Sequence, residues 1–258
     1  MTASPQGTLF LVPTPLDFGC EPPLPPITSV LPLGTLQTAA RLGHWVTENA
    51  KTTRAFLKRV DEACPLRVPL QQMHFQELPR AVHKKGDHLP SSSPDTAQLL
   101  QPSLQGHDLG LVSEAGMPAV ADPGSSVVRA AHALGIQVVP LVGPVSLLLA
   151  LAASGLNGQN FAFVGYLPTD AAVRSQRIRE LEAGALRSGQ TQICIETPYR
   201  NPALLQALLS TLKGSTRLAV CTGLSLPTER VQSATVADWQ ARRWSLAGKA
   251  PAVFAFGA

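Results

Sequence analysis

The sequence predicts an α/β protein built from two α/β domains, residues 1–141 and 142–258. Apolar runs of strand length alternate with amphipathic helical patterns along the first part of the chain, as expected for a sheet with parallel strands. Towards the C-terminus the strand patterns follow one another more closely. We place the domain boundary at the turn between the two patterns, close to the Gly143-Pro144 pair.

The stretch from residue 109 to 156 organises the rest of the chain. Leu109–Ser113 is an apolar run of strand length, followed by a loop rich in Gly, Pro and Ala. Asp122 is expected to act as the N-cap of a helix that runs through Leu134, and Ile136–Leu141 is the next strand. A strand, helix, strand unit implies a right-handed parallel crossover. Ligands bind beyond the carboxyl ends of such strands, where the loop 113–124 lies.

The other elements of the first domain rest on turn residues and apolar periodicity. Pro13 and Pro15 fix an extended, rigid exit from the first strand. In chain order we expect strand Leu9–Val12, irregular chain Gly19–Leu33, helix Thr35–Leu42, strand His44–Thr47, amphipathic helix Glu48–Val60, strand Arg67–Met73, a loop His74–Asp95 with a short helical piece, and helix Asp95–Leu104.

The second domain begins with an apolar helix, Val145–Ser154, which Gly155 ends. Since its residues are apolar on nearly every side, we expect it to be buried almost all round, between layers. The elements that follow are strand Phe161–Tyr166, helix Arg174–Leu186 with its stripe Ile178, Leu181 and Leu186, strand Gln192–Ile195, helix Pro202–Leu212, strands Arg217–Cys221 and Glu229–Ala234, helix Val236–Arg242, and strand Pro251–Phe256.

Composition indicates an ordinary globular protein. The 258 residues are 45% hydrophobic and carry a net charge of +4, with no dense basic run, so nucleic-acid binding is possible but not indicated. The four cysteines show no paired spacing, which favours a reducing, cytoplasmic location over a disulfide framework or zinc site. The longest apolar run, Val145–Ala153, is too short to cross a bilayer, so we expect no membrane association.

Several common chemistries have no motif in this sequence. It contains neither the glycine-rich dinucleotide fingerprint, nor a P-loop, nor the nucleophile elbow of hydrolases. His74, His83 and His88 match no metal-ligand spacing, and we expect no metal.

Four loops at strand ends carry unusual Pro, Gly and acidic residues. If two domains face each other, these loops can converge on a cleft that suits a small molecule. The loops are Pro13–Pro15, Ser113–Gly124, Val142–Ser146 and Glu196–Arg200. Two structural alternatives stay open: Asp122 is only a helix cap, and Glu196 only anchors its turn through an ion pair with Arg200.

Five motifs in order resemble those of one enzyme family. They read GTLFLVPTP, SEAGMPAVADPG, GPVSLLLALAASGL, FVGYLP and ETPYR. Together they resemble the tetrapyrrole methylase superfamily of S-adenosylmethionine-dependent methyltransferases. Within it they look most similar to the ribosomal RNA small-subunit methyltransferase I branch, which 2′-O-methylates a cytidine.

The resemblance implies two α/β domains with the S-adenosylmethionine cleft between them, and a homodimer as the assembly. It also implies the residues that contact the cofactor. These are Pro15, Ser113, Ala115, Gly116, Met117 and Val120 from the first domain, and Val145, Ser146, Glu196, Gly223 and Leu224 from the second. Asp122 and Gly124 match the family's Asp-Pro-Gly and are expected to shape the loop.

The substrate-side motifs depart from the family. Its Glu-Asp-Thr-Arg motif stands here as Glu48-Asn49-Ala50-Lys51, and the turn after the first strand is replaced by a proline-rich segment. The acceptor is therefore left open between an RNA 2′-hydroxyl and an anionic tetrapyrrole-like molecule, and the alternative is a relative that binds the cofactor without methyl transfer. No catalytic residue is assigned. Glu48, Glu196 and Glu229 are the candidates for a general base.

Overall fold

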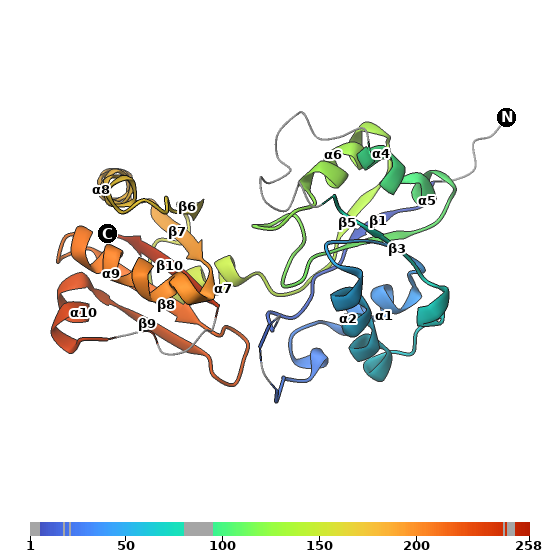
Figure 1. Cartoon of the computed structure of the whole chain (residues 1–258), viewed down its shortest axis with the longest axis horizontal. Coiled ribbons are helices and arrows are strands. Elements are labelled where there is room, and N and C mark those ends of the chain that lie inside the picture. The colour runs from blue at the N-terminus through green and yellow to red at the C-terminus, as the bar shows by residue number, and fades with distance from the viewer. Residues whose placement is uncertain (1–5, 18, 21, 80–94, 245, 247–250) are drawn as a thin grey trace. The chain divides into compact units, whose positions relative to one another are not determined.

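The computed structural model describes residues 6–258 except 18, 21, 80–94, 245 and 247–250. The chain forms two compact units, each with its own five-stranded sheet (Figure 1). Unit 1 comprises Met1–Gly19 with Pro25–Pro144, and unit 2 comprises Cys20–Leu24 with Val145–Ala258. Within the described ranges, the helices are all too short or too polar to span a bilayer.

The sheet of unit 1 is parallel throughout, with strand order β3-β2-β4-β1-β5. Its strands are β1 (Leu9–Leu11), β2 (His44–Thr47), β3 (His74–Glu77), β4 (Leu109–Val112) and β5 (Val138–Pro140). Because β4 and β5 both pair with β1, the predicted parallel crossover is confirmed. The carboxyl ends of all five strands therefore meet at one edge, called here the carboxyl edge of unit 1.

Helices cover both faces of this sheet (Figure 1). Alternate residues of β1 serve the two sides, so that Phe10 packs with one set of helices and Leu9 with the other. The first set is α1 (Leu33–Arg41), α2 (Ala50–Ala63) and the 3₁₀ turn η1 (Ile27–Ser29); the second is α4 (Asp95–Leu99), α5 (Gln101–Leu104) and α6 (Ser125–Ala133).

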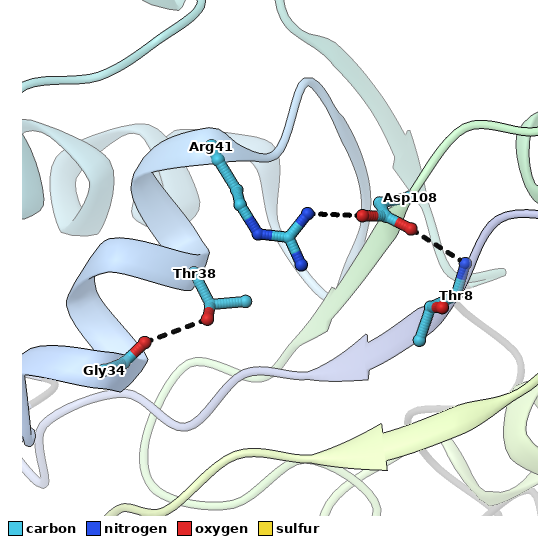
Figure 2. A network of polar contacts seen from close by, with 5 residues as sticks. All are labelled: Thr8, Gly34, Thr38, Arg41 and Asp108. Carbon is cyan, nitrogen blue, oxygen red and sulfur yellow. Dashed lines mark hydrogen bonds and ion pairs between the residues drawn. The ribbon is translucent and has the colours of Figure 1, made fainter.

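At the amino ends of the strands, Arg41 of α1 pairs with Asp108 (Figure 2). The other carboxylate oxygen of Asp108 accepts a hydrogen bond from the Thr8 N–H at 2.9 Å. This network joins the end of α1 to the residues that lead into β4 and β1, and so fixes the helix at the amino edge of the sheet.

Two sequence predictions for unit 1 are wrong. Residues 67–73 are not a strand, since they contain the 3₁₀ turn η2 (Leu70–Gln72), and the strand is β3, inside the predicted loop. Pro69 has no N–H to donate to a ladder, whereas His74, free of that restriction, donates to the Gly43 carbonyl at 2.9 Å. Most of that predicted loop, residues 80–94, lies outside the described residues.

The second error concerns the start of α6. The helix begins at Ser125, with Gly124 at the N-cap position and no side-chain cap bond, so Asp122 is not the cap. Gly124 has φ +134° and Ala121 has φ +65°, so the backbone turns twice before it can become helical.

Unit 2 has a mixed sheet with strand order β6-β7-β10-β8-β9, in which only β6 and β7 pair in parallel. Its strands are β6 (Phe161–Tyr166), β7 (Thr191–Glu196), β8 (Arg217–Thr222), β9 (Arg230–Thr235) and β10 (Ala252–Gly257). One face carries α8 (Ala171–Ser188), α9 (Asn201–Thr211, preceded by the 3₁₀ turn η3, Pro198–Arg200) and α10 (Val236–Arg242), which bury Trp239, Phe254 and Phe256.

The other face of this sheet is covered by α7 (Ser146–Ser154). The Ala150 carbonyl of α7 accepts from the Cys221 thiol of β8 at 3.8 Å, and the Ser154 carbonyl accepts from the Ser233 hydroxyl of β9 at 2.6 Å. Gly155 ends the helix with φ +72°, as predicted. The expected burial on nearly every side is wrong, because Leu148 and Leu149 are 49% and 41% exposed. Within unit 2 the sheet covers only one side of α7, and its other side carries these exposed residues.

Candidate functional site

The loop that follows β4 is tied to the chain that follows β1. The N–H of Thr14 donates to the Gly116 carbonyl at 3.0 Å, and the N–H of Gly116 donates back to the Thr14 carbonyl at 3.1 Å. The Thr14 hydroxyl also donates to the Ser113 carbonyl at 3.3 Å. Residues predicted to contact a cofactor on these two segments, Pro15 and the set from Ser113 to Met117, are therefore held together at the carboxyl edge of unit 1.

This loop has a backbone shape that few residues can adopt. Gly116 has φ +74°, and a Cβ there would lie 3.0 Å from Leu16 Cδ2 and 3.5 Å from the Pro144 carbonyl oxygen. Ala119 and Ala121 also have positive φ, 64° and 65°, which costs energy for residues with a Cβ. Backbone strain of this kind concentrates at ligand-binding loops, so the conformation supports a binding role.

Three carboxylates gather at the same edge. Glu48 follows β2 and Glu114 follows β4, and the Glu114 N–H donates to Glu48 Oε2 at 3.4 Å. The Thr52 hydroxyl donates to Glu114 Oε1 at 3.3 Å. Burial, and then the negative charges of Glu48 and Glu114, raise the pKa of Asp122 to about 7. At neutral pH this carboxyl exists in both protonation states, which is the property of a group that exchanges protons in a reaction.

Sequence reasoning assigned Asp122 a structural role and did not single out Glu114. The two glutamates are 66 residues apart in the chain, and they meet only because β2 and β4 are neighbours in the sheet. The sequence offered one weak signal, that each glutamate stands at the end of an apolar strand pattern: Glu48 directly after it, and Glu114 after one polar residue, Ser113. Without the strand order, that signal does not bring the two carboxylates together.

In unit 2 the predicted residues also gather at one edge of the sheet. Glu196 at the end of β7 and Thr222 at the end of β8 both lie opposite Ala252 of β10, so Gly223 and Leu224 leave the sheet on the side of Glu196. Ala150 of α7 lies at the level of Cys221 and Ser154 farther inside, at Ser233. The N-terminal end of α7, with Val145 and Ser146, therefore points towards that same edge.

The two glutamates of unit 2 are bonded within their own turns. Glu196, with its side chain 5% exposed, lies 3.0 Å from the Arg200 guanidinium and accepts from the Thr197 N–H at 2.8 Å, which confirms the predicted turn-anchoring pair. Glu229 accepts from the Ser225 N–H at 2.7 Å and closes the turn that follows Gly223. Both carboxylates therefore hold the shape of the turns that they close.

Other chemistries find no support in the described part of the chain. No group of three or more His, Cys, Asp or Glu side chains there is arranged to hold a metal ion. His74 stacks on His44 with ring centroids 4.9 Å apart, and His83 and His88 lie outside the described residues. Burial raises the pKa of the Cys194 and Cys221 thiols to about 12 and 11, so neither is a nucleophile at neutral pH.

The surface of the unit 1 loop suits a small ligand with apolar and cationic parts. Val120 is 40% exposed and Met117 is half-buried, so both offer apolar contact. The carboxylates beside them favour positive charge on a ligand. A glycine-rich phosphate cradle would show the opposite electrostatics.

Curated relatives are ribosomal RNA small subunit methyltransferases I. The Pseudomonas aeruginosa protein is 37% identical over 139 residues, 53% of this chain and 48% of the relative. The Halalkalibacterium halodurans protein is 29% identical over 233 residues, 90% of this chain and 70% of the relative. The chain spans about half the length of the first curated relatives that it matches.

Solved structures share the fold over nearly the whole chain. Uroporphyrin-III-C-methyltransferase from Thermus thermophilus matches with a TM-score of 0.54 and 19% identity, covering 98% of this chain and 94% of that one. The methyltransferase CobJ matches with a TM-score of 0.56 and 16% identity, covering 98% and 95%. The profile of the tetrapyrrole (corrin/porphyrin) methylases matches residues 33–240, most of the sequence. The chain therefore belongs to the tetrapyrrole (corrin/porphyrin) methylase family.

Proposed function

We propose that this protein is an S-adenosylmethionine-dependent methyltransferase that methylates a ribose hydroxyl of small-subunit ribosomal RNA. Family membership supports the methyl donor, and the names of the curated relatives support the acceptor. The observation that carries the proposal is the position of Asp122, a carboxyl with a pKa of about 7, on the strained loop at the carboxyl edge of unit 1.

The residues present fit this cofactor. S-Adenosylmethionine carries a sulfonium and an ammonium group, and both positive charges suit the carboxylates of Glu48, Glu114 and Asp122. Its apolar carbon skeleton suits Met117 and Val120. The eleven cofactor contacts inferred from the family motifs remain predictions, and their gathering at one edge within each unit supports them.

The proposed reaction requires no covalent bond between the protein and the substrate or cofactor. When bound, S-adenosylmethionine supplies a methyl group on a sulfonium sulfur, which leaves as a neutral thioether. The Asp122 carboxylate would accept the proton that the ribose hydroxyl loses when its oxygen takes up that methyl group. Burial, and then the charges of Glu48 and Glu114, raise the pKa of Asp122 enough for its carboxylate to accept the proton near neutral pH. The loop positions the reactants and excludes water.

A tetrapyrrole acceptor is less well supported. The likeness to the solved tetrapyrrole methyltransferases, at 16–19% identity, shows the fold alone. The alternative of a relative without methyl transfer draws its support from the altered Glu-Asp-Thr-Arg motif. The three carboxylates at the loop argue against it, because a protein that only bound the cofactor would have no use for a poised proton acceptor.

We also propose a homodimer in the cytoplasm, where a ribosomal acceptor is found. The supporting observation is that unit 2 has exposed apolar side chains on two of its elements. Leu148 and Leu149 of α7 and Phe161 and Phe163 of β6 are 37–49% exposed. Covering such side chains is a common reason for two copies to associate. Light scattering coupled to size-exclusion chromatography measures the mass, and a monomer at micromolar concentration would contradict the dimer.

Two measurements test the reaction. Calorimetric titration with S-adenosylhomocysteine should give saturable binding, and no binding at high micromolar ligand contradicts the cofactor assignment. Transfer of a tritiated methyl group is then compared on small ribosomal subunits lacking the modification and on a precorrin-type tetrapyrrole. Label in the RNA, resistant to alkali at one ribose, is the expected result. Label in the tetrapyrrole alone contradicts the acceptor.

A further inference from the structure

Helix α2 carries a line of exposed positive charge, formed by Lys51, Arg54 and Lys58 and called here the basic stripe. Spacings of three and four residues place these side chains on one side of the helix, over about 10 Å of its length. In the described ranges none of the three forms an ion pair with a carboxylate. Three cations left unpaired on one helix side are available to an anionic partner.

Arg54 adds a flat surface to the stripe. Its guanidinium carbon lies 4.4 Å from the centroid of the Phe75 ring on β3. Phe75 is half-buried and packs against the core of unit 1, so it supports the guanidinium from below. The opposite face of the exposed Arg54 remains open for another planar group.

The acidic groups nearest the stripe lie at the two ends of α2. Glu77 accepts from the Ala50 N–H at the start of the helix, at 2.9 Å, and Asp61 accepts from the Leu66 N–H beyond its end. Arg59, on another side of α2, pairs with Asp17 at 2.9 Å. Glu62 follows Lys58 by four residues, on the last turn, and so bounds the stripe at that end. Between Lys51 and Lys58 the helix itself carries no acidic residue.

The stripe begins beside the candidate site. Lys51 precedes Thr52, whose hydroxyl donates to Glu114 Oε1 of the carboxylate group that surrounds Asp122. A polymer lying along α2 would reach the carboxyl edge of unit 1 at its Lys51 end. The stripe and the carboxylates belong to the same unit, so this relation does not depend on any other part of the chain.

We propose that the basic stripe binds the phosphate backbone of the acceptor RNA, with an unpaired base stacked on the Arg54 guanidinium. Single-stranded RNA combines regularly spaced phosphates with bases that stack on aromatic rings or guanidinium planes, which matches both features of α2. A tetrapyrrole would need a concave apolar surface to cover its ring, whereas the exposed side of a helix is convex. The inference rests on the proposed function and assigns the surface that holds its substrate.

The test replaces Lys51, Arg54 and Lys58 together by Gln. The matched control replaces three exposed arginines of α8, Arg177, Arg179 and Arg187, and so removes the same charge from unit 2. The probe is a fluorescein-labelled single-stranded RNA of 16 nucleotides, followed by anisotropy between 50 and 200 mM salt. We expect at least tenfold weaker binding for the stripe variant at 50 mM salt. Its plot of log K against log salt should be flatter by about 2, from roughly 0.7 per phosphate contact.

A second variant, Arg54→Lys, keeps the charge and removes the plane. It should leave the salt slope unchanged and weaken RNA binding by about fivefold, within the range measured for base stacking. Equal loss in the stripe and α8 variants would overturn the proposal, since the effect would then be net charge alone. The proposal would also be overturned if the wild-type protein bound the RNA probe no more tightly than it binds uroporphyrin III.

The failure of this inference differs from the failure of the proposed function. Calorimetry with S-adenosylhomocysteine is run on every variant, and unchanged cofactor affinity shows that the fold and the donor site are intact. If RNA is methylated by wild type and by the stripe variant at equal KM, the stripe is wrong and the function stands. If the chain methylates a tetrapyrrole and not RNA, the proposed function itself is wrong.

Discussion

The edges of the two sheets use similar residues in different ways. At both edges a strand ends in a loop with Gly, Pro and an acidic side chain. In unit 1 burial, and then the charges of Glu48 and Glu114 from two separate strand ends, raise the pKa of Asp122. In unit 2 Glu196 and Glu229 are bonded to their own turns. Carboxylates that converge from distant parts of the sequence can raise the pKa of a buried neighbour, while carboxylates bonded within their own turns hold a loop in place.

The same contrast separates two Asp residues that precede helices. Asp170 is the N-cap of α8 and accepts from the Ala172 and Val173 N–H groups at 3.0 and 2.9 Å. Asp122 precedes α6, but after positive φ at Ala121 and Gly124 it is Gly124 that takes the N-cap position. One aspartate caps a helix, and the other, buried beside two glutamates, has a raised pKa.

The strongest way to break this comparison is Asp122→Asn. An amide cannot accept the proton, so methyl transfer should fall about 10²–10⁴-fold, the usual effect of a general base. In the wild-type protein the rate should rise with pH through about 7, because only the ionised carboxylate acts. Asp170→Asn is the matched control, since Asn caps helices as well as Asp does. Equal rates for wild type and Asp122→Asn would remove Asp122 from the mechanism.

The same variant has a predicted effect on stability. The folded-state pKa of Asp122 is raised from 3.8 to about 7, so between these values the folded state holds a proton that the unfolded state has lost. Stability from this group is therefore lost as pH rises through that range. Asp122→Asn should raise the free energy of unfolding of unit 1 at pH 8 and change it little at pH 4, as measured by urea titration. A loss at pH 8 would contradict the raised pKa.

The next largest effect is expected for Gly116→Val. The new side chain would meet Leu16 and adopt a disfavoured φ, so the loop must move away from its bridge to Thr14. We expect S-adenosylhomocysteine affinity to fall more than tenfold in a protein that remains folded by circular dichroism. Gly155→Val in unit 2 has a similar φ of +72° and open space around its Cβ, so it separates backbone strain from the loss of loop shape. Equal affinity losses in both variants would count against the assigned loop.

A smaller effect is expected in unit 2 from Arg200→Gln. It leaves the nearly buried Glu196 carboxylate without its cation, which should cost about 1–3 kcal/mol of unfolding free energy. The exposed pair Arg177–Glu180, with side chains 47% and 51% exposed, supplies the control, since Arg177→Gln should cost less than about 0.5 kcal/mol. A double-mutant cycle with Glu196→Gln measures the pair alone. A coupling energy near zero would mean that the turn does not depend on it.

The same difference between local and distant contacts separates the features that the sequence predicts from those that it does not. The bounds of β2, β6 and α10 were predicted to the residue, since local signals specify them: β-branched and aromatic runs or a Thr cap between turn residues. The ion pair between Glu196 and Arg200 joins residues only four apart in the sequence, so it could also be predicted from the local sequence. Features set by neighbours in space were missed. They include the strand His74–Glu77, which exists because β2 offers it a partner, and the convergence of Glu48, Glu114 and Asp122.

The smallest predicted effect lies at the opposite, amino edge of unit 1, where three imidazoles stack. His44 lies 4.9 Å from His74 and 4.8 Å from His107, ring centroid to centroid, close in sequence to the Arg41–Asp108 pair in Figure 2. Burial, then the charges of His107 and His74, lower the pKa of His44 below 6.5. The unfolded chain therefore takes up a proton that folded His44 refuses, and stability falls as pH drops below 6.5.

His44→Gln should therefore raise the melting temperature of unit 1 at pH 5.5 relative to its value at pH 7.5, when compared with the same difference in the wild-type protein. His132→Gln is the control, because His132 is exposed on α6, away from the stack. The amino edge with His44 and the carboxyl edge with Asp122 belong to the same sheet, and lowering the pH changes their contributions to stability in opposite directions. Acid destabilises the fold through the histidines and stabilises it through Asp122, so His44→Gln and Asp122→Asn should tilt the pH profile of unit 1 in opposite senses. If both variants changed the pH dependence of unit 1 stability in the same direction, at least one of the two groups, His44 or Asp122, would not be responsible for it.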